Sequence, residues 1–344
     1  MKKIERTNLA RKRLAPLDIN KCADIEQILD AMADTAFGGR TLGEAWRVLK
    51  AVMDDPECRL IVTVSGAMSV AKLGRVLGQL ITEGIAHAIV STGAVIVHSL
   101  VEELGMYHTV YDNALGDRDL LELGLNRIYD SIEPEENLER LERSVLSALA
   151  TLDAKRAYAS TELITCIANT AAIPQSVGLV GSAVGRGVPI FVPALSDSEI
   201  GLYLFKFQAT TERTYPIYDP SRDLALYAEW LKAARRVAIL TIGGGTPRNW
   251  SQQMVAFLRC EALADGKDAG IDPFVAGIRI CPDPEYLGHL SGSPFSECVS
   301  WGKVQPDAAD KFAEVHCDAT IVLPFLAKAA VEYKRRIQQA RTSE

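Results

Sequence analysis

The chain has 344 residues, of which 48% are hydrophobic and 24% charged, and its formal net charge is −7. These values are ordinary for a soluble globular protein, and the length allows one large α/β domain or two smaller ones. The negative charge argues against a nucleic-acid partner, because a basic face supplies most of that affinity. No stretch is apolar for long enough to span a membrane, and seven cysteines without a Cys-x-x-Cys pair favour free thiols in a reducing cytoplasm.

The predicted elements alternate along most of the chain. Residues 1–20 are basic and irregular and are expected to form an arm, whereas residues 21–344 are expected to form a single domain. A helical pattern over 25–53 is expected to break at Gly38-Gly39. Strands are predicted over 60–64, 88–91, 188–192, 237–241, 274–280 and 318–323, and helices over 70–82, 95–104, 137–150, 223–235, 248–263 and 325–336. This rhythm predicts an α/β fold with a doubly wound, mostly parallel, Rossmann-like sheet and helices on both faces.

Small or glycine-rich turns follow several predicted strands, where ligands bind in folds of this kind. The triple glycine 243–245 precedes a helix, so a phosphate group can approach its backbone and the helix N-terminus. It is neither Gly-x-Gly-x-x-Gly nor a Walker A motif, and alone it fits a tight turn equally well. Several such turns at one sheet edge favour a dinucleotide site; they are 65–67, 91–94, 193–197 and 243–245.

Two residues in or near these turns can have either a purely structural role or a role in binding a ligand. Asp197 can bind a ribose or cap the next helix, and the N-cap is the better interpretation for a lone aspartate. His98 follows the turn 91–94 in an otherwise apolar helix start. For His98, a satisfied core histidine and a pocket residue are evenly balanced.

The segment 284–304 is rich in glycine, proline and serine and ends with Glu297, Trp301 and Lys303 close together. A lysine beside a tryptophan and a glycine can be a desolvated amine, which suits a Schiff-base nucleophile. Taken alone, a surface lysine whose stem covers the indole is the better interpretation. If this stretch is helical, Glu297 and Trp301 share a face and offer a carboxylate and an aromatic wall to a cation.

These segments together resemble the deoxyhypusine synthase family. The resemblance rests on Ser300-Trp-Gly-Lys303 with Glu297 upstream, and on the segments 193–197, 243–245 and 318–324, which occur in the same order over most of the chain. Leu290-Ser-Gly and Thr92-Gly-Ala-x-x-Val-His98 are similar to the bacterial branch.

The resemblance implies a chemistry and a set of site residues. NAD would oxidise spermidine to an imine, diaminopropane would leave, and the aminobutyl group would pass through an imine on Lys303 to an acceptor amine, which is then reduced. Trp301, Glu297, His98 and Asn249 would line the substrate site. The cofactor would be NAD, held by Ser65, Gly66, Thr92, Gly93, Asp197, Gly244, Gly245, Ser291, Asp318 and Ala319, and by Pro282 and Asp283, whose residue types differ from the family's.

The sequence also departs from the family's pattern for binding amines. Leu202 and Leu290 stand where the family has acids, Asn249 where it has a histidine, and His98 where it has a glutamate. An apolar replacement leaves a buried ammonium uncompensated, although Glu199 is a nearby acid that can substitute. The cofactor half is therefore expected to be kept and the amine-recognition half rebuilt.

The leading hypothesis is an aminobutyl transferase that makes homospermidine from spermidine and putrescine. The alternatives are deoxyhypusine synthesis on a lysine of a translation initiation factor, another amine or guanidine substrate, a non-catalytic NAD-binding relative, and a simple dehydrogenase. By resemblance, the expected assembly is a cytoplasmic homotetramer with active sites at a subunit interface.

Overall fold

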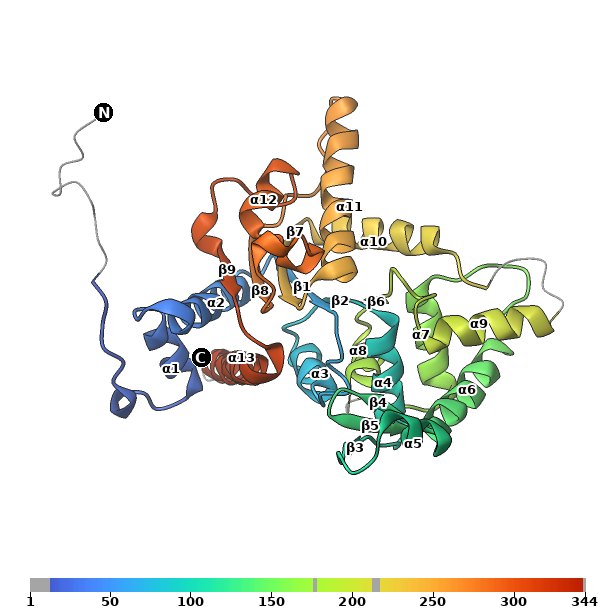
Figure 1. Ribbon diagram of the computed structural model, residues 1–344. Coiled ribbons are helices and arrows are strands. Elements are labelled where there is room, and N and C mark those ends of the chain that lie inside the picture. Colours follow the sequence, from blue (N-terminus) through green and yellow to red (C-terminus); the bar gives the residue numbers. More distant parts are fainter. Residues whose placement is uncertain (1–12, 176–177, 212–216, 343–344) are drawn as a thin grey trace.

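The centre of the computed structural model is a six-stranded sheet in which every strand pair is parallel (Figure 1). The model describes residues 13–175, 178–211 and 217–342. The strand order is β6-β2-β1-β7-β8-β9. The strands are β1 (Cys58–Val64), β2 (Ala88–Ser91), β6 (Ile190–Phe191), β7 (Arg236–Ile242), β8 (Ala276–Ile280) and β9 (Phe312–Val315).

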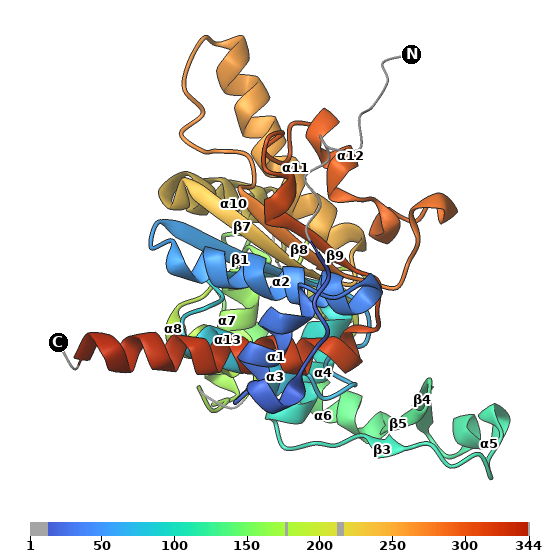
Figure 2. The same ribbon diagram turned by 90° about the vertical axis from the view of Figure 1, so that its left-hand side faces the viewer.

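Helices cover both faces of this sheet, so the predicted doubly wound α/β fold is confirmed. Figure 2 shows α10 (Pro220–Ala234) and α11 (Gly245–Ala264) above it, and α2 (Phe37–Asp54), α3 (Gly74–Thr82) and α13 (Ala319–Thr342) below. In β1, Leu60 and Val62 belong to the core beneath the sheet, whereas Ile61 belongs to the core beneath α10 and α11. Strands buried on both faces are continuously apolar, which is why the strand predictions succeeded here.

The remaining helices and a second, smaller sheet complete the fold. The antiparallel sheet has the order β3-β5-β4 and projects from the body with α5 (Figure 2). The sequence did not predict it, because its strands are only two to four residues long and only β5 has buried residues. These elements are β3 (Thr109–Val110), β4 (Leu125–Ile128), β5 (Ser131–Pro134), α1 (Ile25–Met32), α4 (Gly93–Glu103), α5 (Asp117–Glu122), α6 (Glu135–Leu149), α7 (Ser160–Thr170), α8 (Leu179–Arg186), α9 (Glu199–Thr210) and α12 (Phe295–Ser300).

Two predicted elements are wrong. The predicted strand 318–323 is the first part of α13, because Asp318 Oδ1 accepts a hydrogen bond from the Thr320 N–H (2.8 Å) and starts the helix. The predicted break at Gly38-Gly39 lies inside α2, and the chain turns at residues 33–36 instead. There α1 and α2 approach so closely that a Cβ on Gly43 would lie 2.2 Å from the Ala33 nitrogen.

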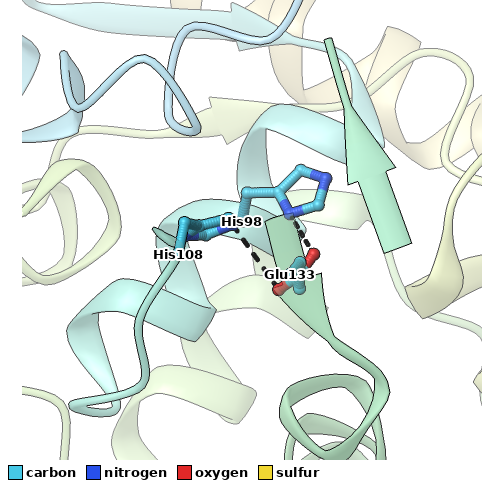
Figure 3. A group of neighbouring side chains, drawn as sticks. All are labelled: His98, His108 and Glu133. Carbon is cyan, nitrogen blue, oxygen red and sulfur yellow. Dashed lines mark ion pairs between the residues drawn. The ribbon is translucent and has the colours of Figure 1, made fainter. Parts of the chain in front are cut away.

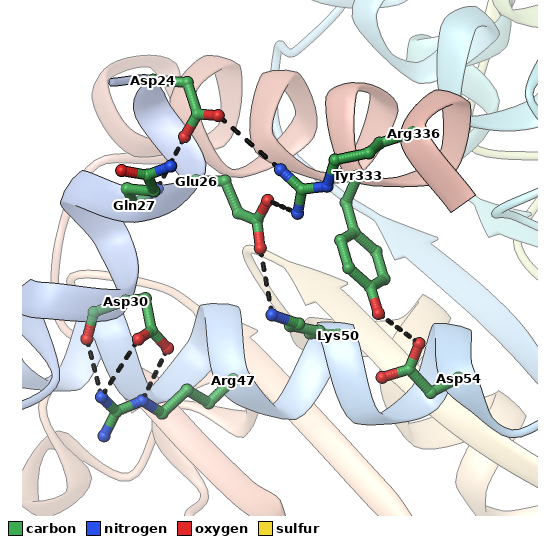
Figure 4. A network of polar contacts seen from close by, with 9 residues as sticks. All are labelled: Asp24, Glu26, Gln27, Asp30, Arg47, Lys50, Asp54, Tyr333 and Arg336. Carbon is green, nitrogen blue, oxygen red and sulfur yellow. Dashed lines mark hydrogen bonds and ion pairs between the residues drawn. The ribbon is translucent and has the colours of Figure 1, made fainter. Parts of the chain in front are cut away.

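Charged residues fasten α1 to α2 and α13 (Figure 4). The buried Glu26 of α1 pairs with Lys50 of α2 (3.0 Å) and with Arg336 of α13. On the neighbouring turn, Arg47 contacts Asp30 at 2.9 Å. The C-terminal half of α13 is thereby held against the N-terminal helices.

The N-terminal segment is described only in part. Residues 1–12 of the predicted arm lie outside the described residues, and Ala15 donates its N–H to the Asp34 carbonyl at 2.9 Å. The division into an arm and one domain therefore stays a prediction. Within the described ranges, every helix is too short or too polar to cross a lipid bilayer.

A buried hydrogen-bonded group holds the short edge strand β6 in place. Asp223 of α10 accepts hydrogen bonds from the Ser160 N–H (2.9 Å) and hydroxyl (2.8 Å), and from the Tyr218 hydroxyl (3.0 Å). The Ser160 hydroxyl in turn accepts the N–H of Val192 (2.9 Å), just past β6. Burial raises the pKa of Asp223 to about 6, so this carboxyl resists ionisation. These hydrogen bonds fix the position at which the 193–197 turn leaves the sheet.

We predict that Asp223→Asn stabilises the protein at neutral pH. The folded chain holds its proton on Asp223 up to about pH 6, whereas the unfolded chain loses it near 3.8, so ionisation costs stability as pH rises through that window. Asparagine keeps the Oδ1 acceptor for Ser160 and can donate from its amide nitrogen to the Tyr218 hydroxyl, which retains the Val192 carbonyl as its acceptor. It does so without the ionisation cost, which amounts to on the order of 1–3 kcal/mol above pH 6 and vanishes below pH 4. Urea unfolding at pH 4 and 7.5 measures the difference.

The matched control is Asp219→Asn, which removes the charge of the exposed carboxyl that caps α10. Hydrogen bonds from Ser221 lower the pKa of Asp219, so its loss destabilises the protein at neutral pH. An Asp223→Asn effect that does not change with pH would contradict the prediction.

Candidate functional site

The strand order reverses between β1 and β7, which pair in parallel over seven residues. The chain proceeds from β1 outwards to β2 and β6, and from β7 outwards to β8 and β9, so the two following connections diverge. Ser65 follows β1 and Gly244 follows β7, and the Gly244 N–H donates to the Ser65 hydroxyl at 3.0 Å. The predicted turns thus meet at the switch point, where doubly wound sheets bind ligands.

The turn after β7 is pressed against the segment after β8. A Cβ on Gly244 would lie 2.6 Å from the Cα of Ser291. The Ser291 hydroxyl donates to the Asp283 carboxylate and lowers the pKa of Asp283, and Pro282 beside it is exposed. Four predicted cofactor residues of different chain segments therefore adjoin one another.

A second close approach lies at the carboxyl end of β2. A Cβ on Gly93, the first residue of α4, would lie 2.4 Å from the Ser198 side chain. Ser198 is also the N-cap of α9 and accepts the Gly201 N–H at 3.4 Å. The N-cap interpretation of Asp197 is therefore wrong; Asp197 is exposed, and its backbone carbonyl would lie 3.6 Å from a Cβ on Gly93.

Helix N-termini gather at this edge. The first residues of α4, α11 and α13 follow β2, β7 and β9 within a few residues, and Asp318 and Ala319 stand at the start of α13. Unpaired N–H groups and the helix dipole make such ends favourable for the phosphates of a dinucleotide. Gly66 and Gly245 at the neighbouring turns have positive φ angles (77° and 61°), which place backbone where a side chain would otherwise intrude.

Lys303 owes its position to the way α12 ends. Trp301 is the C-cap, and Gly302 adopts a left-handed conformation (φ 68°), which reverses the chain. The Lys303 N–H then donates to the Cys298 carbonyl (3.1 Å), and its carbonyl accepts the Phe274 N–H (3.0 Å). The Ser-Trp-Gly-Lys segment is thus a helix-ending turn anchored beside β8.

The Lys303 side chain enters an open pocket of about 690 Å³ between α11 and α12. Its Nζ donates to Asn249 Oδ1 at 2.9 Å and lies 5.5 Å from the ring centre of Trp301. Glu297 and Leu290 line the same pocket. Lys303 is half-buried, whereas Trp301 is 64% exposed, so the indole forms a wall open to solvent.

The pocket also contains polar residues that sequence reasoning missed. They are Gln252, Gln253, Glu285 and His289, and Arg248 forms part of the buried floor. Burial lowers the pKa of Arg248, which donates to the Ser293 carbonyl. The sequence could have indicated Glu285 and His289 by their position, because both belong to the unusual segment 284–304.

Three residues that the sequence analysis considered for the substrate site lie outside this pocket. Leu202 and Glu199 are on α9, and neither lines the pocket around Lys303. His98 of α4 lies beside Glu133 and His108, with Nδ1 3.0 Å from Glu133 Oε2 (Figure 3). The pocket therefore unites Lys303, Trp301, Glu297, Asn249 and Leu290, but not His98.

A family model described as deoxyhypusine synthase matches residues 27–330. A probable deoxyhypusine synthase from Archaeoglobus fulgidus is 30% identical over 314 residues, covering 91% of this chain and 96% of its own. A deoxyhypusine synthase-like protein from Coxiella burnetii is 31% identical, covering 94% and 90%. The chain belongs to the deoxyhypusine synthase family.

A solved structure supports the fold of this deoxyhypusine synthase relative. A crystal structure assigned to a deoxyhypusine synthase from Entamoeba histolytica superimposes with a TM-score of 0.56 at 13% identity, covering 92% of this chain and 96% of that one. Deoxyhypusine synthases are NAD-dependent aminobutyl transferases, and NAD is the cofactor of this chain. The glycine turns, Ser65 and the helix N-termini at the switch point fit that cofactor.

We predict that Gly244→Ala weakens NAD binding by about 10-fold or more, because the added methyl forces Ser291 or the turn to move and overpacking of this kind costs about 1–3 kcal/mol. Titration of the purified protein with NAD, followed by calorimetry, measures the dissociation constant. Gly38→Ala is the control, since its Cβ meets nothing within 4 Å. Equal affinity of the two variants would show that this turn does not contact the cofactor.

Proposed function

We propose that this deoxyhypusine synthase family member transfers the aminobutyl group of spermidine through an imine on Lys303 to putrescine, giving homospermidine. The observation that carries the proposal is the single pocket shared by Lys303, Trp301, Glu297 and Asn249. A protonated polyamine needs aromatic faces and carboxylates along its length, and Trp301 and Glu297 supply one of each.

Lys303 is suited to act as the covalent residue. Its backbone is fixed on both sides by hydrogen bonds, and Asn249 Oδ1 holds Nζ at 2.9 Å, so the amine is oriented before substrate binds. NAD, when bound, supplies the oxidation of the donor amine and the later reduction of the product imine. Nζ attacks the imine carbon of the oxidised donor, diaminopropane leaves, and the acceptor amine then displaces Lys303.

The changed residues bear on which amines enter. Leu290 and Asn249 line the pocket, so two of the departures from the family pattern alter its wall directly. Glu285 lines it as well and offers the carboxylate that Leu290 lacks. We therefore assign to Glu285, rather than Glu199, the contact with the far ammonium of the polyamine.

The choice of a small acceptor rests on the carboxylates of this pocket. With leucine at 290 and asparagine at 249, the pocket keeps Glu297 and Glu285, and once diaminopropane has left, one of them can hold the far ammonium of putrescine while its neutral amine attacks. Modification of a translation initiation factor is the second candidate, favoured by the names of the archaeal relatives.

We also propose a cytoplasmic homotetramer. Large apolar side chains are exposed on the projecting sheet and on α9, and a subunit interface would cover them; they are Tyr107, Val110, Leu121, Tyr129, Leu202 and Phe205. In this assembly Leu202 would lie in a subunit contact, since it is exposed and does not line the pocket of its own chain.

The test of the function is incubation with NAD, spermidine and putrescine, followed by chromatography of the amines. Diaminopropane and homospermidine are expected in equal amounts, and borohydride should trap a substrate-dependent adduct on Lys303. Lys303→Ala should lose product formation and the adduct, with a fall in kcat of at least about 1,000-fold because the covalent route is gone.

Lys232→Ala, which removes an exposed lysine of α10, should behave like the parent. Diaminopropane without homospermidine, together with labelled butylamine on a protein acceptor, would instead support the second candidate. Activity of Lys303→Ala equal to the parent's would disprove the proposal.

Glu285→Gln should raise the KM for spermidine about 10-fold with a smaller change in kcat, because it removes a charge-assisted contact distant from the reacting carbon. Glu199→Gln is the matched comparison, since Glu199 does not line the pocket. A larger effect of Glu199→Gln would transfer the role to α9.

A further inference from the structure

Two histidines and a glutamate from three separate segments converge outside the Lys303 pocket. His98 is on α4, His108 immediately precedes β3, and Glu133 is on β5. One ligand atom from each lies within 4.8 Å of the others, and Figure 3 shows both imidazole rings beside the Glu133 carboxylate. The sequence separation of these residues hid the cluster from motif analysis.

Three polar atoms of this cluster are buried without hydrogen bonds. His98 Nδ1 lies 3.0 Å from Glu133 Oε2, and His108 Nε2 lies 3.5 Å from Oε1, but neither contact has hydrogen-bond geometry. Glu133 is only 1% exposed, and His98 Nδ1, His108 Nε2 and Glu133 Oε1 have no hydrogen-bonding partner. Buried polar atoms without hydrogen bonds are costly, and one ligand placed between these three atoms would satisfy them together.

We propose that His98, His108 and Glu133 bind one divalent transition-metal ion of the Zn²⁺ type. Two imidazole nitrogens and a carboxylate oxygen are a donor set that Zn²⁺ favours, with a fourth position left for water. Ligands at about 2.0–2.2 Å from a tetrahedral ion are about 3.3–3.6 Å apart, so small side-chain rotations bring the three atoms into range.

Lys72 is a cation beside the cluster that must adjust when the ion binds. Its Nζ lies 3.1 Å from His108 Nδ1 and 3.4 Å from Glu102 Oε2. When His108 ligates through Nε2, its Nδ1 carries the proton and cannot accept from an ammonium. Lys72 is half-exposed and already pairs with Glu102, so it can leave Nδ1 at little cost, and the Glu102 carboxylate then offers an acceptor near the ring.

The ion would fasten the projecting sheet to the main body. Glu133 and His108 belong to the β3-β5-β4 unit, whereas His98 belongs to α4, which starts at the carboxyl end of β2. Apart from this cluster, Asn137 of α6 donates to the Tyr107 carbonyl (2.8 Å) and helps hold the entry to β3. A metal here acts on the position of that sheet and needs no part in the transfer reaction.

The test uses the full-length protein, stripped with a chelator and dialysed. Calorimetry with Zn²⁺ should show one site per chain. Co²⁺ substitution should give visible d–d bands without thiolate charge transfer, which separates this site from binding at the exposed Cys260. Bound Zn²⁺ should raise the melting temperature, since an ion that binds only the folded chain stabilises it.

His98→Ala, His108→Ala and Glu133→Gln should each lose the site and the thermal shift, and circular dichroism of the metal-free variants establishes that they fold. His316→Ala and Glu136→Gln, which change exposed residues, should keep both. Lys72→Met should bind at least as tightly as the parent, because the competing donor to Nδ1 is gone. Absence of a stoichiometric site in the parent, or undiminished binding by the three ligand variants, would overturn the proposal whatever the transferase activity.

Discussion

The parallel pairing of β1 with β7 is the constraint on which the rest of the structure depends. The two strands run side by side from Cys58 and Arg236 to Val64 and Ile242, and the chain then leaves them in opposite directions. Diverging connections cannot fill the space between them, so a crevice opens at their carboxyl ends. The last paired residues of the two strands are Val64 and Ile242. Ser65 is the next residue after Val64 and Gly244 is the second after Ile242, so the two meet in the crevice.

The lysine pocket depends on the same sheet indirectly, through the segment that precedes β8. Phe274 precedes β8 and pairs with Val304, so the residue after Lys303 is tied to the sheet. Phe295 and Cys298 of α12 are buried in the core under α10 and α11, which holds the helix that ends at Trp301. The geometry of Lys303 thus follows from a strand bridge, a buried helix face and one left-handed glycine, together with the hydrogen bonds of its backbone and of its amine to Asn249.

The sequence predicted well those features that are repeated along the chain. The predictions of buried strands such as 60–64 and 237–241 were correct, because both faces of these strands are apolar. The segment 318–323 was misjudged because a short apolar run fits a strand or a helix, and the cap at Asp318 decided between them. The sheet at 109–134 and the His98, His108 and Glu133 cluster have no periodic signal, since the strands are short and the cluster depends on tertiary contacts between separate segments.

The two halves of the candidate site differ in how they tolerate substitution. At the cofactor edge the backbone of two glycines packs directly against a neighbour: Gly244 against Ser291 and Gly93 against Ser198 leave no room for a Cβ. In the lysine pocket the wall is made by side chains of α11 and of the 284–303 segment, such as Asn249, Glu285 and Leu290, and these can change without moving the chain. Close glycine contacts resist substitution, which favours an unchanged cofactor site. A wall of side chains can be substituted, which allows the pocket to adapt to a different amine. The departures from the family pattern at Asn249 and Leu290 fall in the second half, where the physical cost of change is smallest.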